Sequence, residues 1–374
     1  MDLSLYRYSL FMALPMMLFF GFHMLLARVP KKKIFSNFLL SRQLIGIALL
    51  ILATNYSVHL FCSIRLKDVN ATILMNMVTY FLCYRLFSAA MMILLENGYM
   101  RRSRFALHLW QWLLFTAVAI SVSLLPDNST AQVCATALLA VWLVIYGLFL
   151  SIRLLRTYSR ATKMFRDTHS DDIGAYIRWL SVFTYWAIGF GVSCGVLTFL
   201  PDEYVFLWIL SSIPFYIYLY CCYQNYILFY ERVENALLEE EKMAETYSAN
   251  LCDTEVAADM APTYRSDIAR RIDEWIKSEG FCTPGITLNE LSMLLCTNRT
   301  YLSSYINRVY GVNFRDWIAG LRIDYAKRLM EQNPRQKIHE IAEITGFLSI
   351  SHFSRTFSIK EGCSPARWRG RTIK

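Results

Sequence analysis

The segment 338–369 reads IHEIAEITGFLSISHFSRTFSIKEGCSPARWR, and it decides the fold of the C-terminal part of the chain. A short helical pattern ends at Gly346, and a second helical pattern begins three residues later, at Ser349. Two short helices joined by a turn of three to four residues form a helix-turn-helix unit. We therefore predict one such unit in this segment.

The segment 286–330 follows the same plan and reads ITLNELSMLLCTNRTYLSSYINRVYGVNFRDWIAGLRIDYAKRLM. Thr287 and Glu290 have the spacing of a capping box, which satisfies the free amides at a helix start. Asn298 is placed to cap the second helix of the unit, and Gly311 is placed to end it. The pattern predicts a second helix-turn-helix unit upstream of the first.

A longer helix over about 314–330 is predicted to join the two units, and an amphipathic helix over 265–277 precedes both. Together the units resemble the DNA-binding domain of the AraC/XylS family of transcription regulators, over 264–374 or about 30% of the chain. One departure is Cys296, because the family usually has glycine in the first turn. The residues that carry the resemblance most specifically are Ile341, Ala342, Gly346, Phe347, Phe353, Arg355, Phe357, Gly362 and Pro365.

A helix-turn-helix unit presents the start of its second helix to base edges in the major groove of DNA. We predict base contacts from Asn298, Arg299, Thr300, Tyr301, Ser303, Ser304, Ser349, Ile350, Ser351, His352 and Arg355. We predict phosphate contacts from Arg308, Lys327, Arg335, Lys337, Arg367, Arg369 and Arg371, each of which could instead be an ordinary solvated charge. The core beneath the two helices is predicted to contain Leu302, Ile306, Phe353 and Phe357.

The net charge of +9 is unevenly distributed along the 374 residues. Residues 264–374 contain 18 basic and 11 acidic side chains, a net charge of +7. Residues 231–260 contain two basic and nine acidic side chains, a net charge of −7. This distribution indicates that the C-terminal module, and not the segment before it, meets a polyanion such as double-stranded DNA.

The first 230 residues have the composition of a membrane domain. The chain is 55% hydrophobic and only 18% charged, whereas globular chains contain about a quarter charged residues. Apolar runs near 20 residues are long enough to cross a lipid bilayer as helices. We predict about seven spans, over 7–27, 43–62, 73–95, 105–125, 132–152, 177–200 and 204–229.

The loops between these spans differ in their content of Lys and Arg, which predicts the orientation in the membrane. Alternate loops contain only Arg7, Arg65 and Lys67. The other loops contain 13 basic residues: Arg28, Lys31, Lys32, Lys33, Arg42, Arg101, Arg102, Arg104, Arg153, Arg156, Arg160, Lys163 and Arg166. We expect a multi-pass protein of the bacterial inner membrane, with the N-terminus outside and the C-terminal module in the cytoplasm.

Arg85 falls near the middle of the third predicted span. A charged residue at that depth is costly and marks a candidate functional site. Its predicted partners are carbonyls, tyrosine hydroxyls, or Asn55 and His59 of the second span, and an anionic ligand could be a further partner. The alternative is an arginine that hydrogen-bonds across the bundle or extends toward the cytoplasmic side.

The predicted organisation has a membrane domain over 1–230, an acidic connector over 231–263 and the DNA-binding domain over 264–374. Part of the connector has heptad-like spacing, with Val233, Leu237, Ala244, Tyr247 and Leu251 on one seam. This is too short to predict a coiled coil, so a homodimer contact there remains open. The whole architecture also resembles membrane-anchored members of the AraC/XylS family.

We expect a one-component transcription regulator in which the membrane bundle senses a signal ligand and the C-terminal module binds DNA and engages the transcription machinery. No enzyme, metal site or cofactor is predicted, because no phosphate loop, nucleophile beside a base, or Cys/His metal spacing is present. One alternative is a receptor whose C-terminal helices bind a protein partner. A second alternative is a transporter with a regulatory tail.

Overall fold

The computed structural model describes residues 3–372 except 97, 100, 101, 128, 198–203 and 250–261. The described residues form helices and no strand, as the predicted all-α fold requires. The chain divides into two compact units. The first unit contains residues 1–159 and 177–240, and the second contains residues 160–176 and 241–374.

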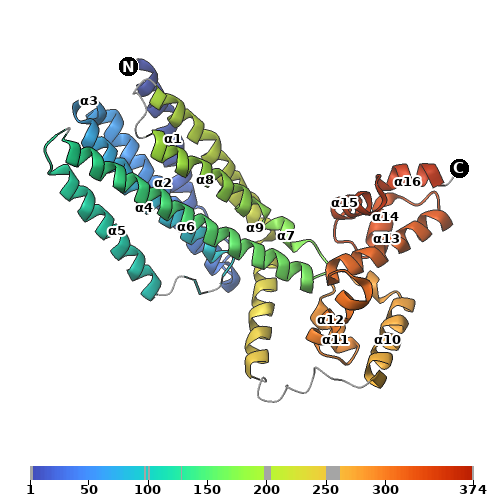
Figure 1. Ribbon diagram of the computed structural model, residues 1–374. Coiled ribbons are helices and arrows are strands. Elements are labelled where there is room, and N and C mark those ends of the chain that lie inside the picture. The colour runs from blue at the N-terminus through green and yellow to red at the C-terminus, as the bar shows by residue number, and fades with distance from the viewer. Residues whose placement is uncertain are drawn as a thin grey trace. The chain divides into compact units, whose positions relative to one another are not determined.

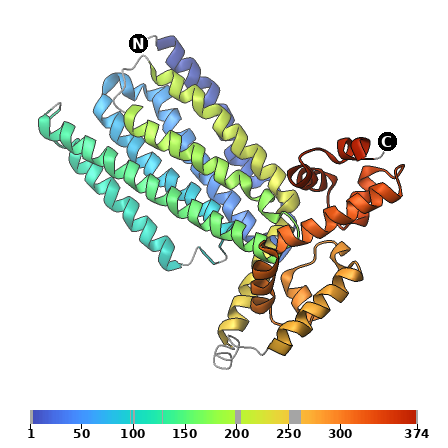
Figure 2. The ribbon, with the colours of Figure 1, turned by 45° about the vertical axis from the view of Figure 1, so that its right-hand side comes forward.

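The first unit is built from long helices that lie side by side in a bundle (Figures 1 and 2). Its elements are α1 (Leu3–Leu26), η1 (Lys33–Phe35), α2 (Ser36–Ser57), the π-helical turn η2 (Val58–Cys62), α3 (Ile64–Lys67), α4 (Val69–Ile93), α5 (Arg102–Ser123), the larger part of α6 (Thr130–Thr168), α8 (Arg178–Leu197) and most of α9 (Val205–Ala249).

Six helical segments in the described part of the chain are long and apolar enough to cross a membrane by length and composition. They are Leu5–Leu26, Lys33–Cys62, Val69–Ile93, Phe105–Ser123, Thr130–Thr168 and Val205–Lys242. The other predicted span, 177–200, corresponds to α8, and its last residues lie outside the described residues. The number of spans therefore stays a prediction.

Aromatic side chains make much of the bundle interior. Phe81 of α4 stacks on Phe115 of α5 and on Tyr146 of α6, with ring centroids 4.5 and 4.3 Å apart. Ser41 of α2 shares a 2.7 Å hydrogen bond with the hydroxyl of Tyr223 on α9. These contacts join helices that are far apart in the sequence.

The second unit contains the C-terminal helical domain, the last turns of α6 and the loop that follows α6. Its helices are α7 (Ile173–Tyr176), α10 (Pro262–Lys277), η5 (Gly280–Cys282), α11 (Leu288–Leu294), α12 (Arg299–Tyr310), α13 (Phe314–Gln332), α14 (Ile338–Ile344), α15 (Ile350–Glu361) and α16 (Pro365–Thr372). Figure 1 shows α13 running between the group α10 to α12 and the group α14 to α16.

The predicted connector begins as a continuation of α9, which runs without a break to Ala249. The remainder, 250–261, lies outside the described residues, as does part of the heptad-like seam. Residues 160–176 were assigned to the membrane domain by the predicted boundaries. In the structure they group with the C-terminal unit.

Candidate DNA-binding domain and ligand cavities

The first helix-turn-helix unit has the caps that its sequence predicts. Thr287 and Glu290 form both hydrogen bonds of a capping box at the start of α11. The Asn298 side chain accepts a 2.7 Å hydrogen bond from the amide of Tyr301 and so caps α12. Gly311 ends α12 in the left-handed region, with φ 70°. The two ends of the candidate base-reading helix α12 are therefore set by local residues.

The turns of the two units share a backbone conformation. Cys296 lies at φ 49° in the first turn, and Gly346 lies at φ 82° in the second. Only glycine adopts this region without strain, so the cysteine in the first turn carries a modest cost. At Gly346 a Cβ atom would also lie 2.2 Å from the carbonyl oxygen of Cys282, so glycine is required there.

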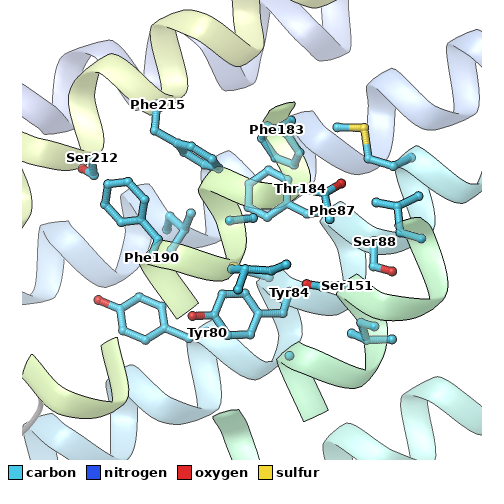
Figure 3. Close-up of a pocket in the computed structure, with 18 of the residues that line it drawn as sticks. Tyr80, Tyr84, Phe87, Ser88, Ser151, Phe183, Thr184, Phe190, Ser212 and Phe215 are labelled. Carbon is cyan, nitrogen blue, oxygen red and sulfur yellow. The ribbon is translucent and has the colours of Figure 1, made fainter. Parts of the chain in front are cut away.

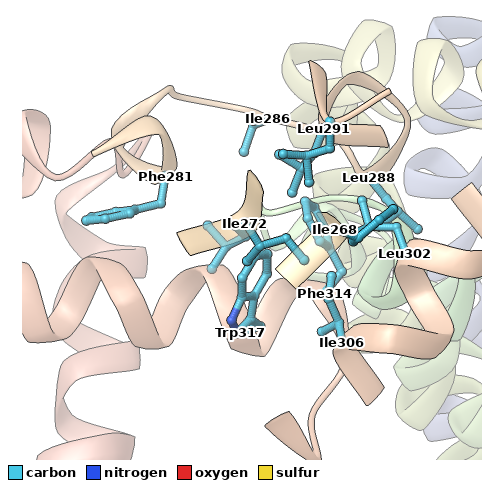
Figure 4. Close-up of a cluster of buried hydrophobic side chains, with 12 residues drawn as sticks. Ile268, Ile272, Phe281, Ile286, Leu288, Leu291, Leu302, Ile306, Phe314 and Trp317 are labelled. Atoms are coloured by element: carbon cyan, nitrogen blue, oxygen red, sulfur yellow. The ribbon is translucent and has the colours of Figure 1, made fainter. Parts of the chain in front are cut away.

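The cores beneath α12 and α15 contain the residues expected from the sequence. Leu302 and Ile306 of α12 are fully buried against α10 and α13, in the cluster that Figure 4 shows. Phe353 and Phe357 of α15 are fully buried in a second cluster with the C-terminal half of α13. Helices α12 and α15 are thus each fixed by burial of one face.

Arg322 of α13 joins the two helix-turn-helix units. It was not among the predicted site residues. The residue is fully buried. Its Nε and Nη2 donate 2.8 Å hydrogen bonds to the carbonyl oxygens of Phe281 and Thr283, and its guanidinium lies 5.6 Å from the ring of Phe347. Burial lowers the pKa of Arg322, and the nearby Asp171 carboxylate opposes that shift. Arg322 follows Ile318 by four residues and so lies on the same, apolar face of the helix. This spacing could have identified it from the sequence.

None of the predicted base-contacting residues is buried. The side chains of Asn298 and Ser349 each accept a hydrogen bond from a main-chain amide and so cap α12 and α15. His352 is half-buried, with its ring 5.4 Å from that of Phe347. Burial lowers the pKa of His352, while the Asp172 carboxylate acts in the opposite direction.

The predicted phosphate contacts separate into two groups. Lys327 forms a 3.0 Å ion pair with Glu361, and Arg369 donates to the carbonyl oxygen of Gln336, so both hold parts of the domain together. The other members are exposed on the surface of the described domain: Arg308, Arg335, Lys337, Arg367 and Arg371.

In the first unit, Arg85 is buried and donates a 3.2 Å hydrogen bond to the hydroxyl of Tyr99. A tyrosine hydroxyl was one of its predicted partners. Asn55 and His59 lie in a different group, because both hydrogen-bond to the Asn76 side chain, at 3.1 and 2.9 Å. This second group lines a smaller cavity that includes Arg65 but not Arg85. The structure therefore separates Arg85 from the two residues grouped with it.

A larger cavity of about 110 Å³ lies within the bundle, between α2, α4, α6, α8 and α9 (Figure 3). Aromatic rings form part of its wall: Phe183 stacks on Phe215 at 4.8 Å, and Phe190 packs on Phe215 at 5.3 Å. We call it the aromatic cavity. The hydroxyls of Thr184 and Ser212 bond to carbonyls of their own helices. The cavity therefore suits an apolar group, about the size of a single ring.

No group of three or more His, Cys, Asp or Glu side chains that could hold a metal ion occurs among the described residues.

Comparison with known proteins identifies the C-terminal region. A helix-turn-helix domain family matches residues 291–371. The HTH-type transcriptional regulator ExsA of Pseudomonas aeruginosa is 35% identical over 82 residues, which cover 22% of this chain and 29% of ExsA. The virulence regulon transcriptional activator VirF of Yersinia enterocolitica is 36% identical over 70 residues, covering 19% of this chain and 26% of VirF.

The uncharacterized HTH-type transcriptional regulator YobQ of Bacillus subtilis is 32% identical over 85 residues, covering 22% of this chain and 34% of YobQ. The chain thus spans only about a quarter to a third of the length of these relatives. No solved structure matches the chain. The C-terminal part of the chain is an AraC-type helix-turn-helix domain, and its homologues are DNA-binding transcriptional regulators.

Proposed function

We propose that this protein is a membrane-embedded, one-component transcription regulator. Its C-terminal domain binds double-stranded DNA through α12 and α15, and its helical bundle senses a ligand from within the membrane. The observation that carries the proposal is the double helix-turn-helix domain, with buried cores beneath two exposed recognition helices, on the same chain as a bundle of long apolar helices.

Binding of one monomer to two turns of DNA is compatible with the length of α13. The helix has 19 residues and is therefore about 28 Å long. Successive major-groove faces lie about 34 Å apart. The recognition helices flank α13, so a modest bend of the DNA brings both grooves within reach.

Gel-shift titration against salt tests the DNA-binding proposal. Each phosphate contact releases counterions, so five exposed basic residues predict a slope of log K against log salt of about −4.5. The test uses the full-length protein in detergent micelles and duplexes selected by that protein from a random pool. Failure to select or bind any duplex at low salt would favour the alternative, in which the domain binds a protein partner.

The surface of the bundle supports the proposed membrane location. Large apolar side chains are exposed along its helices, and several of them are more than half exposed: Phe11, Trp110, Leu124, Leu138, Phe149 and Leu228. Such extensive apolar exposure marks a surface that contacts lipid or another protein. The Lys and Arg bias of the loops then sets the orientation.

Reporter fusions test this topology. A reporter that works only outside the cytoplasm is expected to be active when fused after Asn128. A reporter that works only inside the cytoplasm is expected to be active when fused after Lys374. The reverse pattern would refute the proposed orientation. It would also separate the DNA-binding domain from the compartment that contains DNA.

The aromatic cavity is the proposed site for the signal. Its apolar wall and small volume fit the ring or acyl portion of a lipophilic molecule. Ser88→Phe, which places a large ring at the cavity wall, is expected to abolish the transcriptional response to the signal while leaving the amount of protein in the membrane unchanged. An unchanged response would exclude this cavity as the signal site.

A further inference from the structure

A short segment after α6 lies on the DNA-binding domain as part of the same compact unit. The amide of Ser170 donates a 3.2 Å hydrogen bond to the carbonyl oxygen of Ile286, and His169 pairs with Thr287 as an isolated antiparallel bridge. More than 110 residues separate the two segments of this contact in the sequence. The pairing places the segment at the start of the first helix-turn-helix unit.

The next two residues of the segment are aspartates, and both face arginines of α13. The Asp172 carboxylate lies 2.8 Å from Nη1 of Arg315. The Asp171 carboxylate lies 3.8 Å from Nη1 of Arg322, the residue that ties the two units together. We call residues 169–172 the acidic turn. Its two carboxylates are anionic partners of two arginines of α13, and Arg315 also lies 3.5 Å from the carboxylate of Asp316.

Burial shows that the acidic turn is packed onto this surface. Thr168, His169 and Ser170 are all buried, and the Thr168 hydroxyl shares a 2.7 Å hydrogen bond with Nδ1 of His169. The Ser170 amide is satisfied by the carbonyl oxygen of Ile286, whereas the buried Ser170 hydroxyl has no hydrogen-bond partner in the described part of the chain. The main-chain pairing with Ile286 and Thr287 and the two aspartate–arginine contacts therefore hold the acidic turn on the domain.

The acidic turn also lies close to the start of α15. Arg322, the partner of Asp171, lies 5.6 Å from the ring of Phe347, and that ring lies 5.4 Å from the ring of His352 in the first turn of α15. The charges of Asp172, Arg315, Arg322 and Arg355 all act on this histidine. A carboxylate in this group of charges offsets the cations that would attract DNA and repels the phosphates directly. Docking of the acidic turn and binding of DNA therefore oppose each other.

The loop that carries the acidic turn is joined at its two ends to α6 and α8. Both helices line the aromatic cavity, through Leu148 and Ser151 of α6 and through Phe183 and Thr184 of α8. A molecule that enters the cavity and moves either helix therefore acts directly on an end of the loop. This route to the DNA-binding domain is separate from the connector after α9.

We propose that the acidic turn is an intramolecular ligand of the DNA-binding domain, which weakens DNA binding while docked and is released when the bundle binds its signal. The role of the signal rests on the proposed function of the whole chain. The interaction surface consists of Arg315, Arg322 and the main chain at Ile286 and Thr287, and its partner is a pair of adjacent carboxylates.

The test measures the DNA affinity of full-length variants in detergent micelles, with a duplex selected from a random pool by the wild-type protein. Asp171→Asn with Asp172→Asn removes the partly exposed Asp172–Arg315 ion pair and the longer contact of Asp171 with the buried Arg322, and is expected to tighten DNA binding about five-fold. Ser170→Pro removes the amide donor without changing any charge and is expected to act in the same direction. Asp167→Asn, one turn earlier, is the matched control for charge and is expected to change affinity less than two-fold.

Amide hydrogen exchange supplies a second measurement, which a general effect of net charge on DNA affinity would not change. Addition of the duplex to the wild-type protein is expected to increase exchange at residues 168–172. The proposal is overturned if the double aspartate variant and Ser170→Pro both bind DNA with unchanged or lower affinity. It is also overturned if these amides stay protected in the DNA complex. If the wild-type protein binds no duplex, the proposed function fails first, so the two failures are distinguishable.

Discussion

The buried guanidinium of Arg322 offers a direct test of how the two helix-turn-helix units are held together. Arg322→Leu keeps an apolar side chain in the site but removes the donors for the carbonyl oxygens of Phe281 and Thr283, each 2.8 Å away. Leaving one buried acceptor unpaired costs about 1–3 kcal/mol, so two cost about 2–6 kcal/mol.

Part of this loss is recovered, because the variant no longer buries a charge. A net destabilisation of about 3 kcal/mol is therefore expected for Arg322→Leu, a large fraction of the about 5–15 kcal/mol by which most domains are stable. Arg322→Lys keeps the charge but cannot reach both carbonyl oxygens with a planar fork, so an intermediate loss is expected.

Amide hydrogen exchange of α13 in the full-length protein measures this change within the domain. A loss of 3 kcal/mol corresponds to protection factors lower by about 100-fold. Arg328→Leu is the matched control, because Arg328 lies on the same helix with an exposed side chain over the ring of Tyr325. If Arg322→Leu lowers protection no more than Arg328→Leu does, the hydrogen bonds to the two carbonyls do not hold the units together.

Three further predictions concern the same domain. Gly346→Ala is expected to destabilise it by more than about 3 kcal/mol because a Cβ atom collides with main chain, whereas Gly311→Ala, with φ 70° but open space, costs about 1 kcal/mol; limited proteolysis of both variants checks the difference. The lowered pKa of His352 means that the unfolded chain binds the proton more tightly, so stability is lost as pH falls below about 6.5; His352→Gln is expected to flatten this acid limb in proteolysis between pH 7.5 and 5.5. Thr300→Ala is expected to relax base preference at one position, whereas Lys337→Ala weakens binding to all sequences alike, as competition with variant duplexes would reveal; a uniform loss for both would remove Thr300 from the base-contacting set.

The features that the sequence predicts correctly are local ones. The capping box of Thr287, the cap at Asn298 and the left-handed Gly346 depend on residues within a few positions of each other. The buried faces of α12 and α15 follow from helical periodicity. Such signals need no knowledge of the rest of the chain, so the double helix-turn-helix domain could be predicted in detail.

The contacts that escaped prediction join distant parts of the sequence. Arg322 has an obvious position on the buried face of α13, but its partners in η5 are about 40 residues away. The sequence predicts a loop over 153–176, whose five basic residues from Arg153 to Arg166 were interpreted as an orientation signal, whereas the structure places those five residues in α6. Periodicity carries no information on which distant segment a carboxylate meets, so Asp171 and Asp172 were not identified.

The same limit applies within the bundle. Arg85 was predicted to need a partner within the bundle, and the structure shows it buried with a hydrogen bond to the Tyr99 hydroxyl. The grouping of Arg85 with Asn55 and His59 rested on neighbouring spans alone. The structure gives the latter two a shared partner, Asn76, which sequence patterns did not mark.

The hydrogen bond between Ser170 and Ile286 joins two segments of one polypeptide, so docking of the acidic turn is a unimolecular equilibrium. A partner on the same chain is present at an effective concentration that dilution does not change. The fraction of docked domains is therefore independent of how many copies a cell contains. The signal concentration at which such a regulator responds is then set by its own sequence and does not change with its expression level.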